Sequence, residues 1–283
     1  MRNQALVLFY LWISNFFDWT FFTFAFSSRG AALDALHPCY PFIQSNLTPV
    51  AFPIFLPSLP VMASVTLLTV WASPFSMRAK LALLLKGIEH EDLPQDLGNK
   101  SKLLLESNPV HKKIPVLIHK GKPVSESVII VHYIDEVWPE TSPLLPQDAF
   151  LRAKHRFWTD FIDKKIFDSL AQFMRSSDGG AAVNEEFIQN CMLLEGALAE
   201  LGSEEDGPFF GGASMSFLDV MLAPYSVLIP GVEQVMGLKP ASPEQCPRLH
   251  KLFGAVAEHP SAKAALPQIE KLKEFIQAHF ARK

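Results

Sequence analysis

The sequence lacks the features that mark several large classes of protein. Its 283 residues contain only three cysteines, which are scattered along the chain and form neither a CxxC redox pair nor a zinc-binding spacing. Basic residues form no long run, and the net charge of −4 gives no reason to expect a nucleic-acid partner. A glycine-rich phosphate loop and internal repeats are also absent. The sequence therefore predicts a folded protein of a reducing compartment, with no metal ion and no nucleic acid bound.

The first 63 residues differ from the rest of the chain. Residues 5–26 are almost entirely apolar and carry a single charge, Asp18, over about the 20 residues that span a bilayer. Residues 38–60 are rich in proline and uncharged, which is typical of a tether. Three interpretations remain open for this extension: a membrane anchor, a cleaved targeting peptide, or translated upstream sequence without a structural role. We expect residues 1–63 to be disordered and folding to begin near Ser64.

Residues 64–142 alternate between strand-like and helix-like segments. Short apolar and β-branched runs predict strands at residues 65–71, 88–92 and 116–119, and a hairpin turn at 120–123 leads into a strand at Val124. Helices are predicted at residues 75–86, 100–106 and 127–137. Ser73 and Pro74 form a typical helix start, and Gly87 a typical helix end. The order β-α-β-α-β-β-α predicts a thioredoxin-like α/β domain.

Residues 148–283 show no strand pattern. A proline-rich linker at 139–146 precedes them and marks a domain boundary. Helices are predicted at residues 148–174, 184–201, 244–258 and 269–280, with a break at 176–182. Ser216 and Asp219 have the spacing of a capping box, in which each side chain bonds the other residue's backbone N–H. The second domain is therefore predicted to be all-helical.

Ser73 lies where the first strand gives way to the first helix, and its residue type fits two roles. As a helix cap it would stabilise the helix by about 1 kcal/mol. As a hydrogen-bond donor at the positive end of a helix, it could instead stabilise a bound thiolate without a general base. No nucleophile elbow surrounds this serine, so the pattern excludes a conventional serine hydrolase.

Two further segments allow both a structural and a ligand-binding interpretation. Pro115 precedes a strand, where it is an ordinary strand-start residue or, in the cis form, leaves the Ile114 backbone free to pair with an extended peptide. Glu126 and Ser127 open a helix, which is a favourable first turn or a site for a ligand's ammonium and carboxylate groups. Lys100 and Lys113, when each is considered alone, are expected to be solvated surface charges.

Taken together, these segments carry a specific resemblance. The ordered runs are Trp-Ala-Ser-Pro-Phe at 71–75, Glu-Asp-Leu at 91–93, Asp-Leu-Gly-Asn-Lys-Ser at 96–101, Asn-Pro-Val-His-Lys-Lys-Ile-Pro-Val-Leu at 108–117, Gly-Lys-Pro-Val-Ser-Glu-Ser at 121–127 and Tyr-Ile-Asp-Glu-Val-Trp at 133–138. In these runs the sequence closely resembles the glutathione-binding domain of plant tau-class glutathione transferases. The likeness continues more loosely to the C-terminus, whereas the N-terminal extension has no counterpart in the family.

The resemblance implies a binding role for several residues. For glutathione, it assigns Ser73 to the thiolate, Lys100 and Lys113 to the glycine carboxylate, the Ile114 backbone to the cysteinyl unit, and Glu126 and Ser127 to the γ-glutamyl end. For the apolar electrophile, it assigns Trp71, Phe75, Leu97 and Phe167. Ala171 and Met174 occupy positions where many relatives carry Arg and Trp, which leaves the electrophile preference open. Serine rather than cysteine at position 73 favours conjugation over thiol-disulfide exchange.

The sequence therefore predicts a glutathione transferase that joins the glutathione thiolate to hydrophobic electrophiles, with glutathione as co-substrate. The resemblance also implies a homodimer, a cytosolic location and a role in detoxification or stress. Two alternatives remain: a non-catalytic carrier of glutathione or hydrophobic ligands, and a transferase held at a membrane by residues 5–26. Measuring conjugation to an aryl halide separates the enzyme from the carrier.

Overall fold

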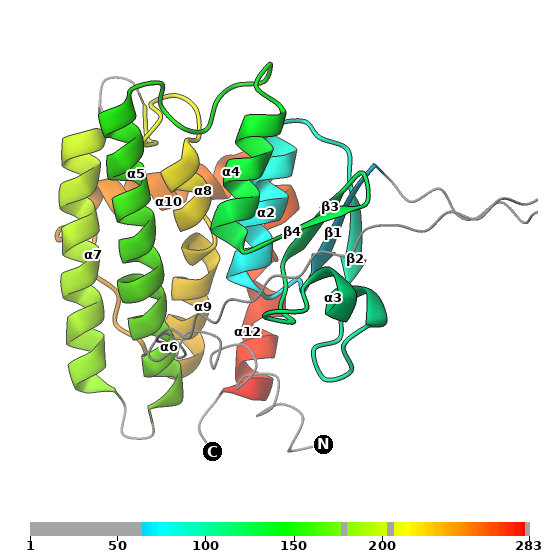
Figure 1. Cartoon of the computed structure of the whole chain (residues 1–283). Helices are drawn as coiled ribbons and strands as arrows, with labels where there is room; N and C mark the ends of the chain where they lie inside the picture. Colours follow the sequence, from blue (N-terminus) through cyan, green and yellow to red (C-terminus); the bar gives the residue numbers. More distant parts are fainter. Residues whose placement is uncertain (1–63, 177–179, 203–206, 281–283) are drawn as a thin grey trace, which may run out of the picture. The chain divides into compact units, whose positions relative to one another are not determined.

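The computed structural model describes residues 64–176, 180–202 and 207–280. The expected extension at 1–63 lies outside the described residues, and so does the candidate anchor at 5–26. Within the described ranges, no helix is both long and apolar enough to cross a membrane. The described chain consists of an α/β part followed by a helical part, as Figure 1 shows.

The α/β part is built on a four-stranded sheet with the strand order β2-β1-β3-β4. Its strands are β1 (Val65–Thr69), β2 (Glu91–Pro94), β3 (Val116–His119) and β4 (Lys122–Ser125). β1 runs parallel to β2 and antiparallel to β3, and β3 forms a hairpin with β4. The two central strands are buried along their length, whereas the edge strands are partly exposed. This is the predicted thioredoxin-like arrangement.

Three helices flank the sheet: α2 (Pro74–Leu85), α3 (Lys102–Ser107) and α4 (Ser127–Val137). Figure 1 shows α2 and α4 side by side on one face and α3 on the other. The predicted second strand begins later than expected, at Glu91, because Ile88 N–H still bonds the Leu83 carbonyl oxygen at 2.9 Å and belongs to the end of α2. α3 likewise begins after Lys100, because Ser101 is its cap.

The helical part begins with a long continuous segment. It comprises α5 (Ala149–Phe161), the π-helix η2 (Ile162–Phe167) and α6 (Asp168–Arg175). The predicted helix at 148–174 is therefore confirmed in extent, but its middle is a π-helix. The remaining helices are α7 (Ala181–Leu201), α8 (Phe217–Leu222), α9 (Tyr225–Met236), α10 (Pro247–Glu258), α11 (Pro260–Ala265) and α12 (Ile269–His279).

The sequence pattern did not indicate α9 and α11. α9 contains Pro230, and an internal proline normally ends a helix because it has no N–H to donate. The tertiary structure retains α9 by packing it against α12. The two helices approach closely at Gly231, where an added Cβ would lie 3.1 Å from Ile276 Cδ1. The predicted capping box is confirmed: buried Asp219 accepts hydrogen bonds from both the N–H and the hydroxyl of Ser216 at 2.7 Å.

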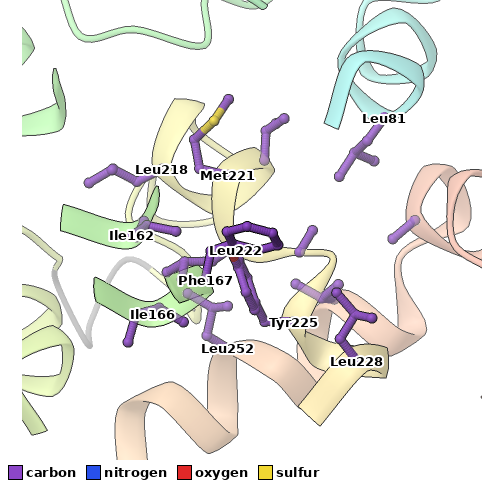
Figure 2. Packing of buried hydrophobic residues seen from close by; sticks show 14 of the residues in the cluster. Leu81, Ile162, Ile166, Phe167, Leu218, Met221, Leu222, Tyr225, Leu228 and Leu252 are labelled. Atoms are coloured by element: carbon purple, nitrogen blue, oxygen red, sulfur yellow. The ribbon is translucent and has the colours of Figure 1, made fainter. Parts of the chain in front are cut away.

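One hydrophobic core extends from the sheet helices into the helical part. Figure 2 shows side chains of α2, η2, α8, α9 and α10 meeting around buried Phe167 and Tyr225. Each large apolar side chain that is fully buried contributes about 1.5–3 kcal/mol. Because this core is shared, α2 is held between the sheet and the helical part, and the residue at its N-terminus faces both.

Candidate active site

Ser73 is held in the turn between β1 and α2. Its side chain is 1% exposed and accepts a hydrogen bond from Ser76 N–H at 3.4 Å, which makes it the N-cap of α2. Its own N–H bonds the Val70 carbonyl oxygen at 3.0 Å, and the Ser76 hydroxyl accepts from Val70 N–H at 3.2 Å. Because the Ser73 oxygen acts as an acceptor in the cap, its hydroxyl hydrogen remains available for a ligand.

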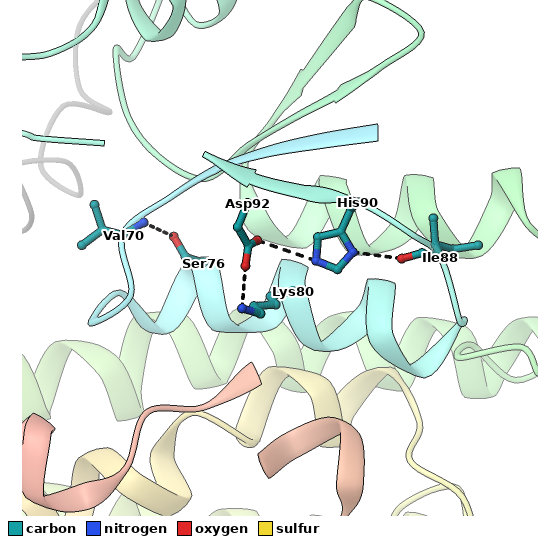
Figure 3. A network of polar contacts seen from close by, with 6 residues as sticks. All are labelled: Val70, Ser76, Lys80, Ile88, His90 and Asp92. Atoms are coloured by element: carbon teal, nitrogen blue, oxygen red, sulfur yellow. Dashed lines mark hydrogen bonds and ion pairs between the residues drawn. The ribbon is translucent and has the colours of Figure 1, made fainter. Parts of the chain in front are cut away.

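A network of polar side chains fixes α2 against the edge of the sheet. Figure 3 shows Asp92 of β2 between Lys80 of α2 and His90. Lys80 Nζ lies 2.5 Å from Asp92 Oδ2, and His90 Nε2 lies 3.6 Å from Asp92 Oδ1. His90 Nδ1 in turn lies 2.9 Å from the Ile88 carbonyl oxygen. These contacts join the helix to its neighbouring strand and so fix the position of the Ser73 turn.

Ser73 lines a cleft of about 170 Å³ between the α/β part and the helical part. The α/β part contributes Val70, Ala72, Ser73, Gln95, Asp96 and Leu97, and the helical part contributes Met174, Leu228, Leu272, Phe275, Ile276, His279 and Phe280. Most of these side chains are apolar. The cleft, called here the Ser73 cleft, therefore places one hydroxyl beside a mainly hydrophobic cavity.

The four residues predicted for the electrophile pocket lie in different places. Leu97 lines the Ser73 cleft. Trp71 lines a neighbouring cleft of about 500 Å³, with its ring edge-on to Phe275 at 5.5 Å between centroids. Phe75 and Phe167 contact each other edge to face at 5.0 Å, and neither is among the lining residues of the Ser73 cleft.

Sequence reasoning did not identify the wall that α12 contributes to the Ser73 cleft. Leu272, Phe275, Ile276 and His279 recur at helical spacing and form one face of that helix. That spacing is a signal in the sequence for one mainly apolar helix face. It did not indicate which neighbour the face would meet, because that depends on how the last helix packs.

Lys100 and Lys113 lie close enough to repel each other. Partial burial lowers the pKa of Lys100, and the charge of Lys112 lowers it further. Burial and the charge of Lys100 lower the pKa of Lys113, while Glu126 opposes this shift. Asn108 orders the same loop by donating to the Lys113 carbonyl oxygen at 3.0 Å. A bound anion would relieve the repulsion between the two ammonium groups.

The strand register brings the remaining predicted residues to one edge of the sheet. Val116 of β3 pairs with Ser125 of β4, so Ile114 before β3 and Glu126 after β4 lie at the same end of the hairpin. The Ile114–Pro115 peptide bond is cis. Glu126 has a φ of 74°, and Ser127 begins α4 with a buried side chain. β1 also ends at this edge, just before the Ser73 turn.

The edge is therefore a composite site. It combines a helix-capping hydroxyl, a turn with a cis peptide bond, an acid beside a second helix start and a pair of partly buried lysines. Within the described residues, no group of three or more His, Cys, Asp or Glu side chains is placed to hold a metal ion. Such a site can bind an extended molecule with charged groups at both ends and a reactive atom near Ser73.

Comparisons with known proteins identify the family of the chain. The family described as "Glutathione S-transferase, N-terminal domain" matches residues 63–136. The chain is 42% identical to glutathione S-transferase U19 of Arabidopsis thaliana over 213 residues, which cover 75% of this chain and 94% of the relative. It is 40% identical to the probable glutathione S-transferase parC of Nicotiana tabacum over 215 residues, with coverages of 75% and 94%.

Solved structures of tau-class enzymes superpose on the described chain. A tau-class glutathione S-transferase from mango has a TM-score of 0.72 and 38% identity, over 76% of this chain and 98% of that one. A rice glutathione S-transferase solved in complex with glutathione has a TM-score of 0.69 and 39% identity, over 77% and 98%. The chain therefore belongs to the tau class of the glutathione S-transferase family, transferases that conjugate glutathione.

Proposed function

We propose that the Ser73 hydroxyl donates a hydrogen bond to the sulfur of bound glutathione and stabilises its thiolate. A free thiol has a pKa of about 8.5, and lowering it by two units requires about 2.7 kcal/mol. A hydrogen bond to a charged acceptor supplies about 1.5–3 kcal/mol. The helix N-terminus adds about 0.3–1 kcal/mol. The observation that supports the proposal is the position of this buried hydroxyl, at the start of α2 and on the wall of an apolar cleft.

The rest of glutathione lies, in this proposal, along the edge of the sheet. Lys100 and Lys113 bind the glycine carboxylate, whose negative charge offsets the burial and the neighbouring lysine charges that lower their pKa values. The Ile114 backbone pairs with the cysteinyl unit. Glu126 and Ser127 bind the γ-glutamyl end, where the start of α4 favours a carboxylate. The position of Ile114, Glu126 and Ser127 at the end of the sheet where β1 leads into the Ser73 turn supports the assignment.

The second substrate is an apolar electrophile bound in the Ser73 cleft. The lining consists mainly of aliphatic and aromatic side chains, with Asp96 and His279 as the ionisable residues among the described ones. The thiolate sulfur attacks the electrophilic carbon, a new S–C bond forms, and the leaving group departs with the bonding electrons. The protein contributes an ionised nucleophile and the alignment of both reactants.

Replacing Ser73 with Ala tests the role of the hydroxyl. We expect the pKa of the bound thiol to return toward about 8.5. At pH values below the pKa of the bound thiol in the unchanged enzyme, kcat/KM for an aryl halide should fall by up to about 100-fold. Ultraviolet absorbance of the thiolate, followed against pH, measures the first quantity. Asp148→Ala is the matched control, because it removes the cap that accepts from Leu151 N–H at 2.8 Å, away from the site.

Two results separate the possible outcomes. A Ser73→Ala enzyme with an unchanged thiol pKa and unchanged turnover would contradict the role of Ser73. Glutathione binding without any conjugation across several classes of electrophile would instead favour the carrier, which no present finding supports.

We further propose that the enzyme is a homodimer of the cytosol with a role in detoxification. Large apolar side chains on α4 and α5 are exposed in the single chain, including Ile129 and Phe157, and support a second copy as partner. Expression from Met1 and from Met62, followed by cell fractionation, tests the location. We expect both forms in the cytosolic fraction, and sedimentation of the Met1 form with membranes would establish the anchor.

A further inference from the structure

A cleft of about 340 Å³ lies beside the linker that joins α4 to α5. Its walls are linker residues 142–147, several residues of the loop between 210 and 216, Leu151 and His155 of α5, and Leu201 of α7. None of these residues lines the Ser73 cleft. This linker cleft is thus a separate cavity of a size that accepts a small organic molecule.

The walls of the linker cleft are fixed by hydrogen bonds inside the protein. On the linker side, the Asp135 carboxylate accepts from Leu144 N–H at 2.8 Å and from Leu145 N–H at 3.1 Å. On the loop side, the Asp219 carboxylate accepts from the Ser216 backbone and hydroxyl at 2.7 Å. The buried polar groups of both walls are therefore already satisfied, and the cavity has a defined shape.

His155 is the exception among these buried groups. His155 is 5% exposed. Its Nδ1 atom is inaccessible to solvent and has no hydrogen-bond partner among the described residues. Burial lowers the pKa of His155 to about 4. The ring is therefore neutral at neutral pH, and one of its two nitrogens is an acceptor. Because Nδ1 is inaccessible to solvent, a ligand in the cleft meets the ring at its other nitrogen, Nε2, and gains a hydrogen bond there when it supplies a donor.

The other lining residues restrict the ligand further. His155 is the only ionisable residue among the described residues that line the cleft, so a charged ligand would lose its hydration without gaining an opposite charge. Leu151, Phe210 and Met215 supply apolar surface, and a thioether makes favourable contacts with aromatic rings. The ligand is therefore neutral, partly apolar and carries a hydrogen-bond donor.

We propose that the linker cleft binds a small neutral phenol, whose hydroxyl donates to the His155 ring and whose aromatic ring packs against Phe210 and Met215. A phenol combines the donor and the apolar body in one rigid molecule, which loses little entropy on binding. The site is independent of the conjugation reaction, because it shares no residue with the Ser73 cleft.

A titration of the full chain, with histidine labelled with nitrogen-15, tests the proposal directly. The probe is 4-methylphenol, and 4-methylanisole is the matched compound of similar shape that lacks the donor. We expect 4-methylphenol to shift the ring-nitrogen resonances of His155 saturably, and 4-methylanisole to bind about tenfold more weakly. His155→Gln assigns the resonance. His250→Gln is the control, because this ring contacts the Ala241 carbonyl oxygen outside the cleft.

Three results would overturn the proposal. The first is the absence of any saturable shift of His155. The second is equal binding of the two compounds, which would show that the imidazole accepts no hydrogen bond from the ligand. The third is a shift confined to His279, which would place the phenol in the Ser73 cleft. The comparison of the two compounds uses the unmodified chain, so it decides the question even if a His155 variant fails to fold.

Discussion

Ser73 combines an observed structural role with a proposed chemical one. Its oxygen accepts from Ser76 N–H at 3.4 Å, which is worth about 1 kcal/mol as a helix cap. That bond uses a lone pair and leaves the hydroxyl hydrogen unused. The cap and the proposed donation to sulfur are therefore compatible.

At the same scale, Lys113 gives a testable prediction about glutathione binding. Replacing Lys113 with Met removes a charged donor to the glycine carboxylate, so we expect about a tenfold higher Kd. S-methylglutathione is the suitable ligand for calorimetry, because it has no thiol to titrate. Lys102→Met is the control, since the Lys102 side chain is 87% exposed and pairs with neighbouring Glu106 at the surface. An unchanged Kd for Lys113→Met would show that this lysine does not bind the glycine carboxylate.

The same lysines predict a pH dependence. The carboxylate binds the ammonium form, and the pKa values of both Lys100 and Lys113 are lowered from the ordinary 10.5. Affinity for S-methylglutathione should therefore fall as pH rises. The α-amino group of the ligand also titrates below the ordinary lysine range, so the contribution of Lys113 is the difference in pH dependence between the unchanged chain and Lys113→Met. A difference that appears only in the ordinary lysine range would contradict the shifted pKa values.

At the scale of elements, α2 is fixed from two sides. Lys80 joins it to β2, and the fully buried Arg78 joins it to the helical part. Arg78 Nε donates to the Met221 carbonyl oxygen at 3.1 Å, and Arg78 Nη2 lies 2.7 Å from Asp163 Oδ1 in η2. Burial alone would lower the pKa of Arg78, but Asp163 and Tyr225 raise it above its ordinary value, so the guanidinium stays charged.

This ion pair predicts a large effect on stability. Asp163→Asn leaves the buried Arg78 without its opposite charge, which typically costs about 3–5 kcal/mol. Denaturant unfolding measures the loss. Asp160→Asn is the matched control one turn earlier, because its pair with Lys164 is exposed and worth about 0–1 kcal/mol. Equal losses in the two variants would show that the buried pair does not hold α2 to the helical part.

At the scale of the whole molecule, the exposed apolar side chains of α5 indicate a partner. Phe150 is 67% exposed and Phe157 is 60% exposed, and their spacing of two turns places them on one face of the helix. Exposed aromatic residues on one helix face are typical of an interface between protein chains. In the proposed homodimer, a second copy of the chain covers these exposed side chains of α5.

The proposed interface is testable by changing one of these rings. Phe157→Glu places a charge in the apolar contact, so we expect the dimer to dissociate at least tenfold more readily. Light scattering over a concentration series measures the mass. Leu105→Glu is the control, because Leu105 is 38% exposed on α3, away from α5. A dimer that survives Phe157→Glu unchanged would exclude this face of α5 as the contact.

Much of the fold could be predicted from the sequence because its signals are local. The hydroxyl caps at Ser73 and Ser216 mark the starts of α2 and α8 in the structure. α4 occupies the predicted residues. α9 and the π-helix η2 could not be predicted, because Pro230 argues against a helix locally and the π-turns carry no pattern of their own. Packing against neighbouring helices outweighs those local preferences.

By itself the sequence determined the order of the elements, the thioredoxin-like class of the first domain and the residue types available at the sheet edge, because caps, turns and hydrophobic periods act over a few residues. Only the tertiary structure decided that α12 forms a wall of the Ser73 cleft, whereas Phe75 and Phe167 pack against each other outside its lining. It also decided that His155 lies buried without a partner for Nδ1. The reason is that a cavity is formed by residues distant in sequence, and their meeting depends on how whole elements pack.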